Sequence, residues 1–280
     1  MSAAAYDAPE AVVLEDFAKP DAFADCACQG GVTAKIESSS DPVKAGAVSG
    51  RYSARNEAHE PNGAWAKARR VFSPVLNIAN QKALGVWVYG DGQGEVLNVQ
   101  LGSPHHIARG IADHYVKVDF TGWRYFELIE PEGGHIEDYT WPYGGAYAIY
   151  REDVNHAHIE SLSLWYNNLP KGKDAACSLS PIKALPLAAC TVANPKVTIA
   201  GKTVAFPAEV ESGCYLEFRS MTDCKLYGTK GELIREITPE GEAPLLEPGD
   251  NRIEFACDAS DGVNPRAYVT VIGQGEPLRE

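Results

Sequence analysis

Short runs of alternating apolar and polar residues, each closed by a turn signal, constrain the fold of this chain more than any other feature. Residues 83–89 read Ala-Leu-Gly-Val-Trp-Val-Tyr, and residues 96–101 repeat the alternation after the glycine-rich segment 90–94. A period of two places successive side chains on opposite faces of a strand, and a glycine-rich link between two such runs predicts a hairpin. No stretch of 12 residues shows a clean helical period, so the pattern predicts β-structure.

Similar runs follow one another along the whole chain. In the first part we expect strands at residues 12–17, 83–89, 96–101, 115–120, 123–128 and 159–166. In the second part we expect shorter strands at residues 196–199, 202–206, 215–218, 224–227, 232–237, 251–256 and 267–272. The 26 Gly and 18 Pro supply the turns between them. The spacing predicts an all-β chain, with an antiparallel two-sheet β-sandwich followed by a smaller immunoglobulin-like sandwich.

Aromatic and histidine residues divide the chain into two parts. All five Trp and all seven His lie within the first 165 residues. Aromatic side chains with polar tips dominate binding surfaces, so the first part is the candidate for function and the second for support. We expect an N-terminal tail at 1–11, a binding domain at 12–186 and a support domain at 194–280, joined by a proline-containing linker.

Charge and hydropathy exclude several kinds of partner. The chain carries 25 basic and 38 acidic residues, a net charge of −13, which disfavours nucleic acid and anionic lipid as ligands. It has no run of 18 apolar residues, so we expect no membrane insertion. The first residues do not form a signal peptide. The chain is therefore expected to be cytoplasmic if complete, or extracellular or at the cell surface if it is a region of a longer exported protein. The pairing of its seven Cys stays open.

Three segments carry a family resemblance. They are VVLEDF at 12–17, KALGVWVYGDGQGEVLNVQL with VKVDFTGWRYFEL at 82–128, and IESLSLWYNNLPKGKDAACSLSPIKAL at 159–185. Together they resemble the galactose-binding-like jelly-roll modules appended to bacterial polysaccharide-degrading enzymes. The segments SGCYLEF and EPGDNRIEF resemble the small sandwich domains that end such chains. The resemblance implies non-catalytic binding of a plant, algal or microbial polysaccharide, beside catalytic domains of the same parent chain.

Sugar binding needs flat apolar faces for pyranose rings and planar polar groups for hydroxyls. Trp87, Asn98 and Gln100 are expected to point away from the inner core, and the two amides share one face because they are two residues apart. We therefore expect these three side chains to contact a glycan. The alternative is a solvated sheet face with the Trp packed under loops.

Two loops supply further candidate ligand contacts. The loop at 103–109 offers His105, His106 and Arg109, whose guanidinium suits a carboxylate or a sulfate on a sugar. The segment 139–147 places four aromatics among nine residues, and Trp141, Tyr143 and Tyr147 are expected to form a stacking platform. The alternatives are an exposed loop in the first case and a loop packed over a sheet end in the second.

The resemblance also implies that a structural calcium is frequent, although no cofactor is required. Calcium binds several oxygens at a loop. Glu15, Asp16 and Asp41 are the expected donors because the opening strand and the loop at 38–46 are the usual place for the ion in similar modules.

Catalysis is not expected. The sequence contains no Gly-x-Ser-x-Gly, Gly-x-x-x-x-Gly-Lys-Ser or His-Glu-x-x-His motif. Two alternatives to a binding module stay open: a jelly-roll lyase acting on an acidic glycan, and a structural spacer or protein-interaction module. Glycan binding without product release would support a binding module, and release of unsaturated products would support a lyase. The absence of glycan binding would support a spacer.

Overall fold

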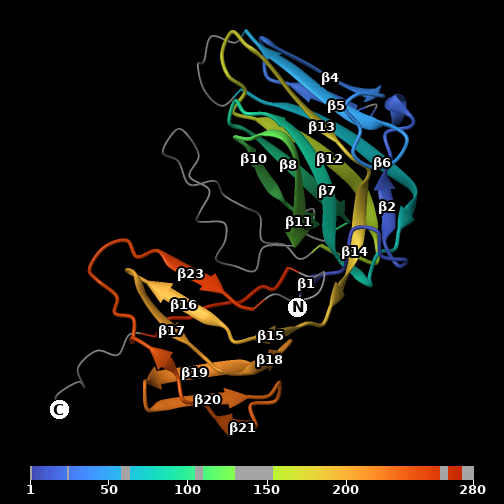
Figure 1. The fold of residues 1–280 in the computed structure, drawn as a ribbon. Coiled ribbons are helices and arrows are strands. Elements are labelled where there is room, and N and C mark those ends of the chain that lie inside the picture. Colours follow the sequence, from blue (N-terminus) through green and yellow to red (C-terminus); the bar gives the residue numbers. More distant parts are fainter. Residues whose placement is uncertain are drawn as a thin grey trace, which may run out of the picture. The chain divides into compact units, whose positions relative to one another are not determined.

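The computed structural model describes residues 2–23, 25–57, 64–104, 110–129, 154–258 and 264–272. The chain forms two compact units. One comprises Ala3–Leu187, and the other comprises Ala188–Glu280 together with Met1–Ser2. Figure 1 colours both units along the chain.

The first unit contains an eight-stranded antiparallel sheet. Its main path is β1 (Ser2–Ala3), β14 (Ile182–Ala188), β7 (Gln81–Asp91), β13 (Asp174–Leu179), β5 (Ser49–Asn56) and β4 (Val32–Ser39). Two further strands pair off this path: β11 (Thr121–Ile129) with β7, and β2 (Val12–Glu15) with β14.

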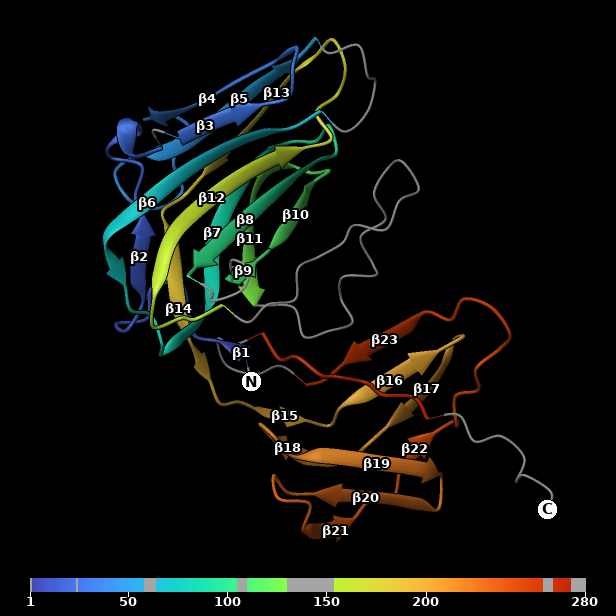
Figure 2. The ribbon, with the colours of Figure 1, turned by 180° about the vertical axis from the view of Figure 1, so that it is seen from behind.

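A six-stranded antiparallel sheet packs against it, and Figures 1 and 2 show the two sheets stacked face to face. Its path is β10 (Tyr115–Val118), β8 (Glu95–Ser103), β12 (Ile159–Asn167), β6 (Ala66–Leu76) and β3 (Asp25–Cys28), with β9 (Gly110–Ala112) beside β8. β6 and β12 run side by side along the curved sheet (Figure 2). The all-β sandwich predicted from the sequence is confirmed.

The core lies between the sheets and is built from the alternation seen in the sequence. Its fully buried aliphatic side chains include Val86 and Val88 of β7, Leu97 and Val99 of β8, and Leu162 and Leu164 of β12. Tyr52 of β5 stacks on Tyr166 of β12, with ring centroids 5.0 Å apart, and so links the two sheets. The inward faces predicted for these strands are confirmed.

The glycine-rich segment 90–94 does not form the expected hairpin. β7 and β8 belong to different sheets, so Gly92 and Gly94, both with positive φ, carry the chain from one sheet to the other. The alternation located β7 and β8 but could not tell which strands they pair with. The N-terminal residues expected as a tail are also part of this unit, since Ala3 and Tyr6 are buried.

Helix is nearly absent from the part of the chain that the structure describes. One short 3-10 turn, η1 (Pro20–Ala22), is present there. Among those residues, no helix has the length and apolar character that a bilayer crossing requires.

The second unit is built from three small sheets. They are β15 (Thr191–Ala193) with β18 (Glu209–Glu211); β22 (Glu240–Gly241), β17 (Lys202–Ala205), β16 (Lys196–Ile199) and β23 (Ile253–Ala256); and β19 (Tyr215–Ser220), β20 (Asp223–Tyr227) and β21 (Leu233–Glu236). Ala200 and Gly201, both with positive φ, form the tight turn between β16 and β17. The domain boundaries and the immunoglobulin-like assignment stay predictions.

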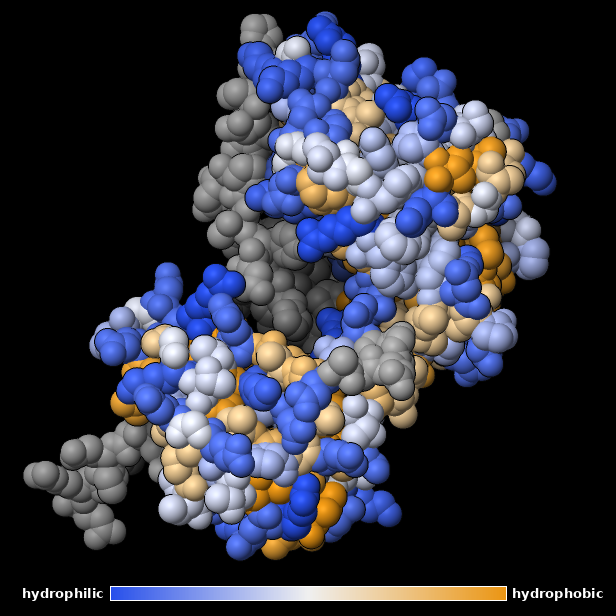
Figure 3. All heavy atoms as spheres, in the orientation of Figure 1, coloured by the Kyte–Doolittle hydropathy of each residue, from blue (hydrophilic) through white to orange (hydrophobic). Residues whose placement is uncertain are grey.

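The strand expected at 267–272 is not formed. These residues pair with no strand among those described, and Tyr268 and Ile272 are exposed. A segment with strand-like alternation becomes a strand only where its backbone N–H and C=O groups can hydrogen-bond to a neighbouring strand. Figure 3 shows apolar side chains gathered at several places on this unit, where Leu233, Ile234 and Leu245 are among the exposed residues.

One carboxylic acid lies inside the sandwich. Glu95, at the start of β8, is 0% exposed and accepts a hydrogen bond of 2.5 Å from the Tyr166 hydroxyl. Burial raises the pKa of the Glu95 carboxyl to about 7; the neighbouring Asp91 adds to the rise, and the Tyr166 hydrogen bond opposes it. The folded protein therefore holds this carboxyl neutral at pH values at which the unfolded chain ionises it.

This difference predicts a pH dependence of stability. Because the folded pKa of Glu95 lies above the unfolded value, its contribution is fully present below about pH 4.5 and is lost as pH rises through about 7. Relative to Glu95→Gln, the wild-type free energy of unfolding should fall by about 3 kcal/mol between these limits. Urea denaturation across this pH range measures the difference. Parallel curves for Glu95→Gln and wild type would contradict the assignment.

Candidate functional site

The outer face of the six-stranded sheet carries two cross-strand rows of side chains. The first row, in register across five strands, is Tyr115, Asn98, Trp165, Lys67 and Ala27. The second is Gln100, Ser163, Arg69 and Asp25. Directly opposed residues in a sheet lie on the same face, so these rows are neighbours on one surface. We call the set Trp65, Lys67, Arg69, Gln100, Asp113 and Trp165 the Trp165 face.

A hydrogen-bond network fixes the polar side chains of this face. Asp113 Oδ1 accepts from the amides of both Asn98 (2.7 Å) and Gln100 (2.8 Å). Gln100 Oε1 in turn accepts from the indole N–H of Trp165 at 3.2 Å. Because each of these groups holds the next, the buried Asp113 carboxylate fixes the Gln100 amide and the Trp165 indole, which are partly exposed.

A buried histidine anchors the network to the backbone. The main-chain N–H of His114 donates to Asn98 Oδ1 at 3.0 Å, and its Nδ1 lies 2.8 Å from the Val99 carbonyl, to which it donates. Burial lowers the pKa of His114 to about 4, against the opposing effects of the Val99 hydrogen bond and of Asp113. The ring is therefore neutral at neutral pH, and its contribution to stability is lost as pH falls from about 6.5 through 4.

Two indoles form the apolar part of the face. The rings of Trp65 and Trp165 lie 5.4 Å apart at 50°, and both side chains are partly exposed. The Lys67 ammonium lies 4.8 Å from the Trp165 ring centroid, and an Arg69 nitrogen lies 3.9 Å from Asp25. Flat apolar surface thus lies beside an amide, a guanidinium and a carboxylate, which are the planar hydrogen-bonding groups that pair with vicinal hydroxyls.

The structure separates the residues that the sequence grouped together. Asn98 and Gln100 share one face as expected, but Asn98 is only 1% exposed, so it positions Asp113 from beneath the surface. Trp87 lies on β7, on the outer face of the other sheet. The remaining predicted contacts lie outside the described residues: His105, His106, Arg109, Trp141, Tyr143 and Tyr147.

The expected calcium donors do not fit a cation. The two carboxylate oxygens of Glu15 contact the Arg70 guanidinium and the main-chain N–H of Phe17, so a positive charge already occupies this position. Asp16 accepts a hydrogen bond from the Ala18 N–H, and Asp41 lies exposed. No cluster of three or more metal-ligating side chains occurs in the described ranges. The suggestion of calcium at Glu15, Asp16 and Asp41 is therefore not supported by the geometry.

Five residues of this face were not predicted as site residues: Trp65, Lys67, Arg69, Asp113 and Trp165. For Trp165, the alternation on β12, with Leu164 and Tyr166 inward, was a usable signal. Asp113 had no local signal, because it reaches Asn98 only through the pairing of β9 and β10 with β8.

Comparisons with known proteins give likenesses of fold only. No protein-family model and no curated protein matches the chain. Similar solved structures include a family 11 carbohydrate-binding module from Clostridium thermocellum in complex with a β-1,3-1,4-mixed-linked tetrasaccharide, at 13% identity and a TM-score of 0.42, covering 64% of this chain and 96% of the module.

Two further solved structures show similar likeness. TmCBM27, a carbohydrate-binding module studied for specific mannan recognition, has 12% identity and a TM-score of 0.34, over 64% of this chain and 99% of that one. An exo-β-agarase has 10% identity and a TM-score of 0.39, over 63% of this chain but only 25% of that one. At these values no ligand for this chain follows from them.

The network predicts a stability cost when its shared acceptor is removed. Asp113→Ala leaves the Asn98 and Gln100 amide donors without their acceptor, which should lower the free energy of unfolding by about 1–3 kcal/mol. Asp113→Asn keeps an acceptor oxygen and should lose less. Asp119→Ala, which removes an exposed ion pair with Lys117, should change stability by less than about 1 kcal/mol. Equal stability of Asp113→Ala and wild type in urea would refute the network.

Proposed function

We propose that the first unit is a non-catalytic carbohydrate-binding module and that the Trp165 face binds a neutral oligosaccharide. The observation that carries the proposal is the indole pair of Trp65 and Trp165 directly beside the fixed amide of Gln100. Pyranose rings stack their CH-rich faces on indoles, while their hydroxyls pair with planar polar groups.

The charges of the face support a neutral sugar. The face carries two cations, Lys67 and Arg69, and two carboxylates: Asp25 lies 3.9 Å from Arg69, and Asp113 accepts hydrogen bonds from the Asn98 and Gln100 amides. A balanced set can hydrogen-bond hydroxyls through charged donors and acceptors without requiring a charged ligand.

The fixed positions of the side chains also support binding. Gln100 is held from both ends, by Asp113 and by Trp165, so little side-chain entropy remains to be lost when a ligand is bound. Such a module would act beside catalytic domains of a longer exported chain. Its partner would be a polysaccharide rather than a protein or a nucleic acid.

The proposal predicts the effect of removing one indole. Trp165→Ala should weaken binding of a neutral oligosaccharide about ten- to hundredfold, because it removes a stacking ring and the indole N–H that holds Gln100. Isothermal titration calorimetry with tetramers of neutral glucans, mannans and galactans measures the change. Circular dichroism verifies that the variant is folded.

Tyr215→Ala is the matched control, since it removes an exposed aromatic of the second unit. Its affinity should equal that of wild type. Full affinity in Trp165→Ala, or an equal loss in Tyr215→Ala, would contradict the assignment of the site. Unsaturated products after incubation with the glycan would identify the lyase alternative instead.

A further inference from the structure

The outer face of the eight-stranded sheet carries a second aromatic surface, on the opposite side of the sandwich from the Trp165 face. β7 and β11 pair so that Trp87 opposes Tyr125 and Tyr89 opposes Trp123. Their ring centroids lie 5.1 and 5.4 Å apart, and Tyr89 is 38% exposed. We call these four residues, with Lys44 and Arg51, the Tyr89 face.

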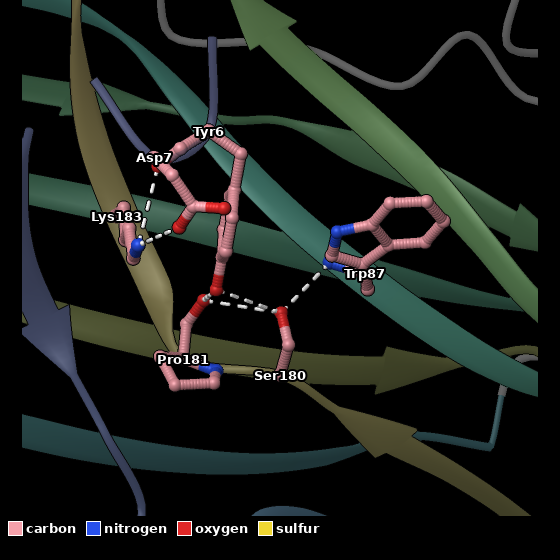
Figure 4. Close-up of polar contacts among 6 residues, drawn as sticks. All are labelled: Tyr6, Asp7, Trp87, Ser180, Pro181 and Lys183. Carbon is pink, nitrogen blue, oxygen red and sulfur yellow. Dashed lines mark hydrogen bonds and ion pairs between the residues drawn. The ribbon is translucent and has the colours of Figure 1, made fainter. Parts of the chain in front are cut away.

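Hydrogen bonds beneath this surface hold it in place. The Tyr6 hydroxyl donates to the Pro181 carbonyl at 2.6 Å, and the Ser180 hydroxyl accepts the main-chain N–H of Trp87 at 2.9 Å. Figure 4 shows these contacts with the Trp87 indole directed away from them. The Tyr6 ring meets Tyr125 edge to face at 5.9 Å, so the aromatic side chains rest on a fixed support.

Glycine at position 85 is part of that support. A Cβ atom at Gly85 would lie 2.9 Å from the Tyr125 hydroxyl and 2.7 Å from a Leu185 methyl group. The absence of a side chain therefore lets the Tyr125 ring lie close to β7.

Two cations of this face form no ion pair with the carboxylates that the structure describes, although Glu37 stands directly opposite Arg51 on β4. Lys35 pairs with Glu37 at 2.8 Å, and Arg55 pairs with Glu57 and Asp174. In the part of the chain that the structure describes, no ion pair forms at Lys44 or Arg51. The Lys44 ammonium instead lies 4.6 Å from the Trp87 ring centroid.

Arg51 is exposed and shares a cross-strand row with two of the aromatic residues. The row is Glu37, Arg51, Ser178, Tyr89 and Trp123. Two strand spacings, about 10 Å, separate the backbones of Arg51 and Tyr89. Cations beside aromatic rings stand out in a chain with a net charge of −13.

From this charge complementarity we propose that the Tyr89 face is a separate binding site for an acidic oligosaccharide. Pyranose rings stack on Tyr89 and Trp123, and carboxylate or sulfate groups on the sugar pair with Arg51 and Lys44. This site is independent of the neutral-sugar site on the Trp165 face, because no side chain is shared between the two.

Calorimetry with oligogalacturonate and with a sulfated galactan oligomer tests the proposal and distinguishes carboxylate from sulfate. The full-length wild type should bind at least one of them, and more weakly at high salt. Arg51→Gln and Lys44→Gln should each lower that affinity about fivefold to tenfold, and Tyr89→Ala about tenfold. Arg51 is exposed, so Arg51→Gln remains decisive if Tyr89→Ala unfolds.

Two controls separate this site from the rest of the molecule. Arg55→Gln removes a cation of the same face that is already paired with Glu57 and Asp174, and Trp165→Ala alters only the opposite face; both should bind acidic oligomers as wild type does. The proposal is overturned if neither acidic oligomer binds, which would leave a protein segment as the occupant of the face. It is also overturned if Arg51→Gln keeps full affinity or if Trp165→Ala abolishes binding of both acidic and neutral oligomers. Loss of neutral-sugar binding alone would bear only on the Trp165 face.

Discussion

Burial of the alternate aliphatic side chains of β7, β8 and β12 between two sheets sets the direction of every other side chain on these strands. Val88, Val99 and Leu164 are fully buried, so their neighbours must point outward. A shift of one residue in any of these strands would exchange its core face with its outer face. The same packing that stabilises the sandwich therefore creates two outer surfaces of different chemistry, one on each sheet.

The two surfaces differ because their strands carry different outward residues. On the six-stranded sheet, amides and carboxylates share hydrogen bonds with one indole, so the polar groups are matched and held. On the eight-stranded sheet, four aromatic rings lie near Lys44 and Arg51, which form no ion pair with the residues that the structure describes. In both cases buried polar groups, such as His114 beneath one face and Ser180 beneath the other, fix the outward side chains from below. Rigid presentation of this kind lowers the entropy lost on binding.

Much of the fold could be predicted from the sequence, because β7, β8, β12 and most strands of the second unit show clear alternation. β6 was missed because its inward face carries the small Ala66 and Ala68 and the charged Arg70, which pairs with the buried Glu15, so no clear apolar alternation is visible. β13 was missed because its residues are mostly small. Pairing was beyond prediction, since β12 lies between β8 and β6, strands that are distant from it in the sequence.

The site was predicted only where its signal was local. Asn98 and Gln100 share a face because they are two residues apart, and the structure agrees. Trp87 and Asn98 are close in sequence but lie on different sheets, because segment 90–94 crosses the sandwich instead of forming a hairpin. Trp65 and Asp113 join the site through pairing between distant strands, which no local pattern records.

The indole N–H signals of the five tryptophans in a ¹H–¹⁵N NMR titration test the central claim most directly. Each signal can be assigned with single Trp→Phe variants. With a neutral oligosaccharide that binds, the Trp165 and Trp65 signals should shift in a saturable way while those of Trp87 and Trp123 stay in place. Saturable shifts confined to Trp87, Trp123 or Trp141, with Trp165 and Trp65 unmoved, would contradict the assignment of carbohydrate binding to the outer face of the six-stranded sheet.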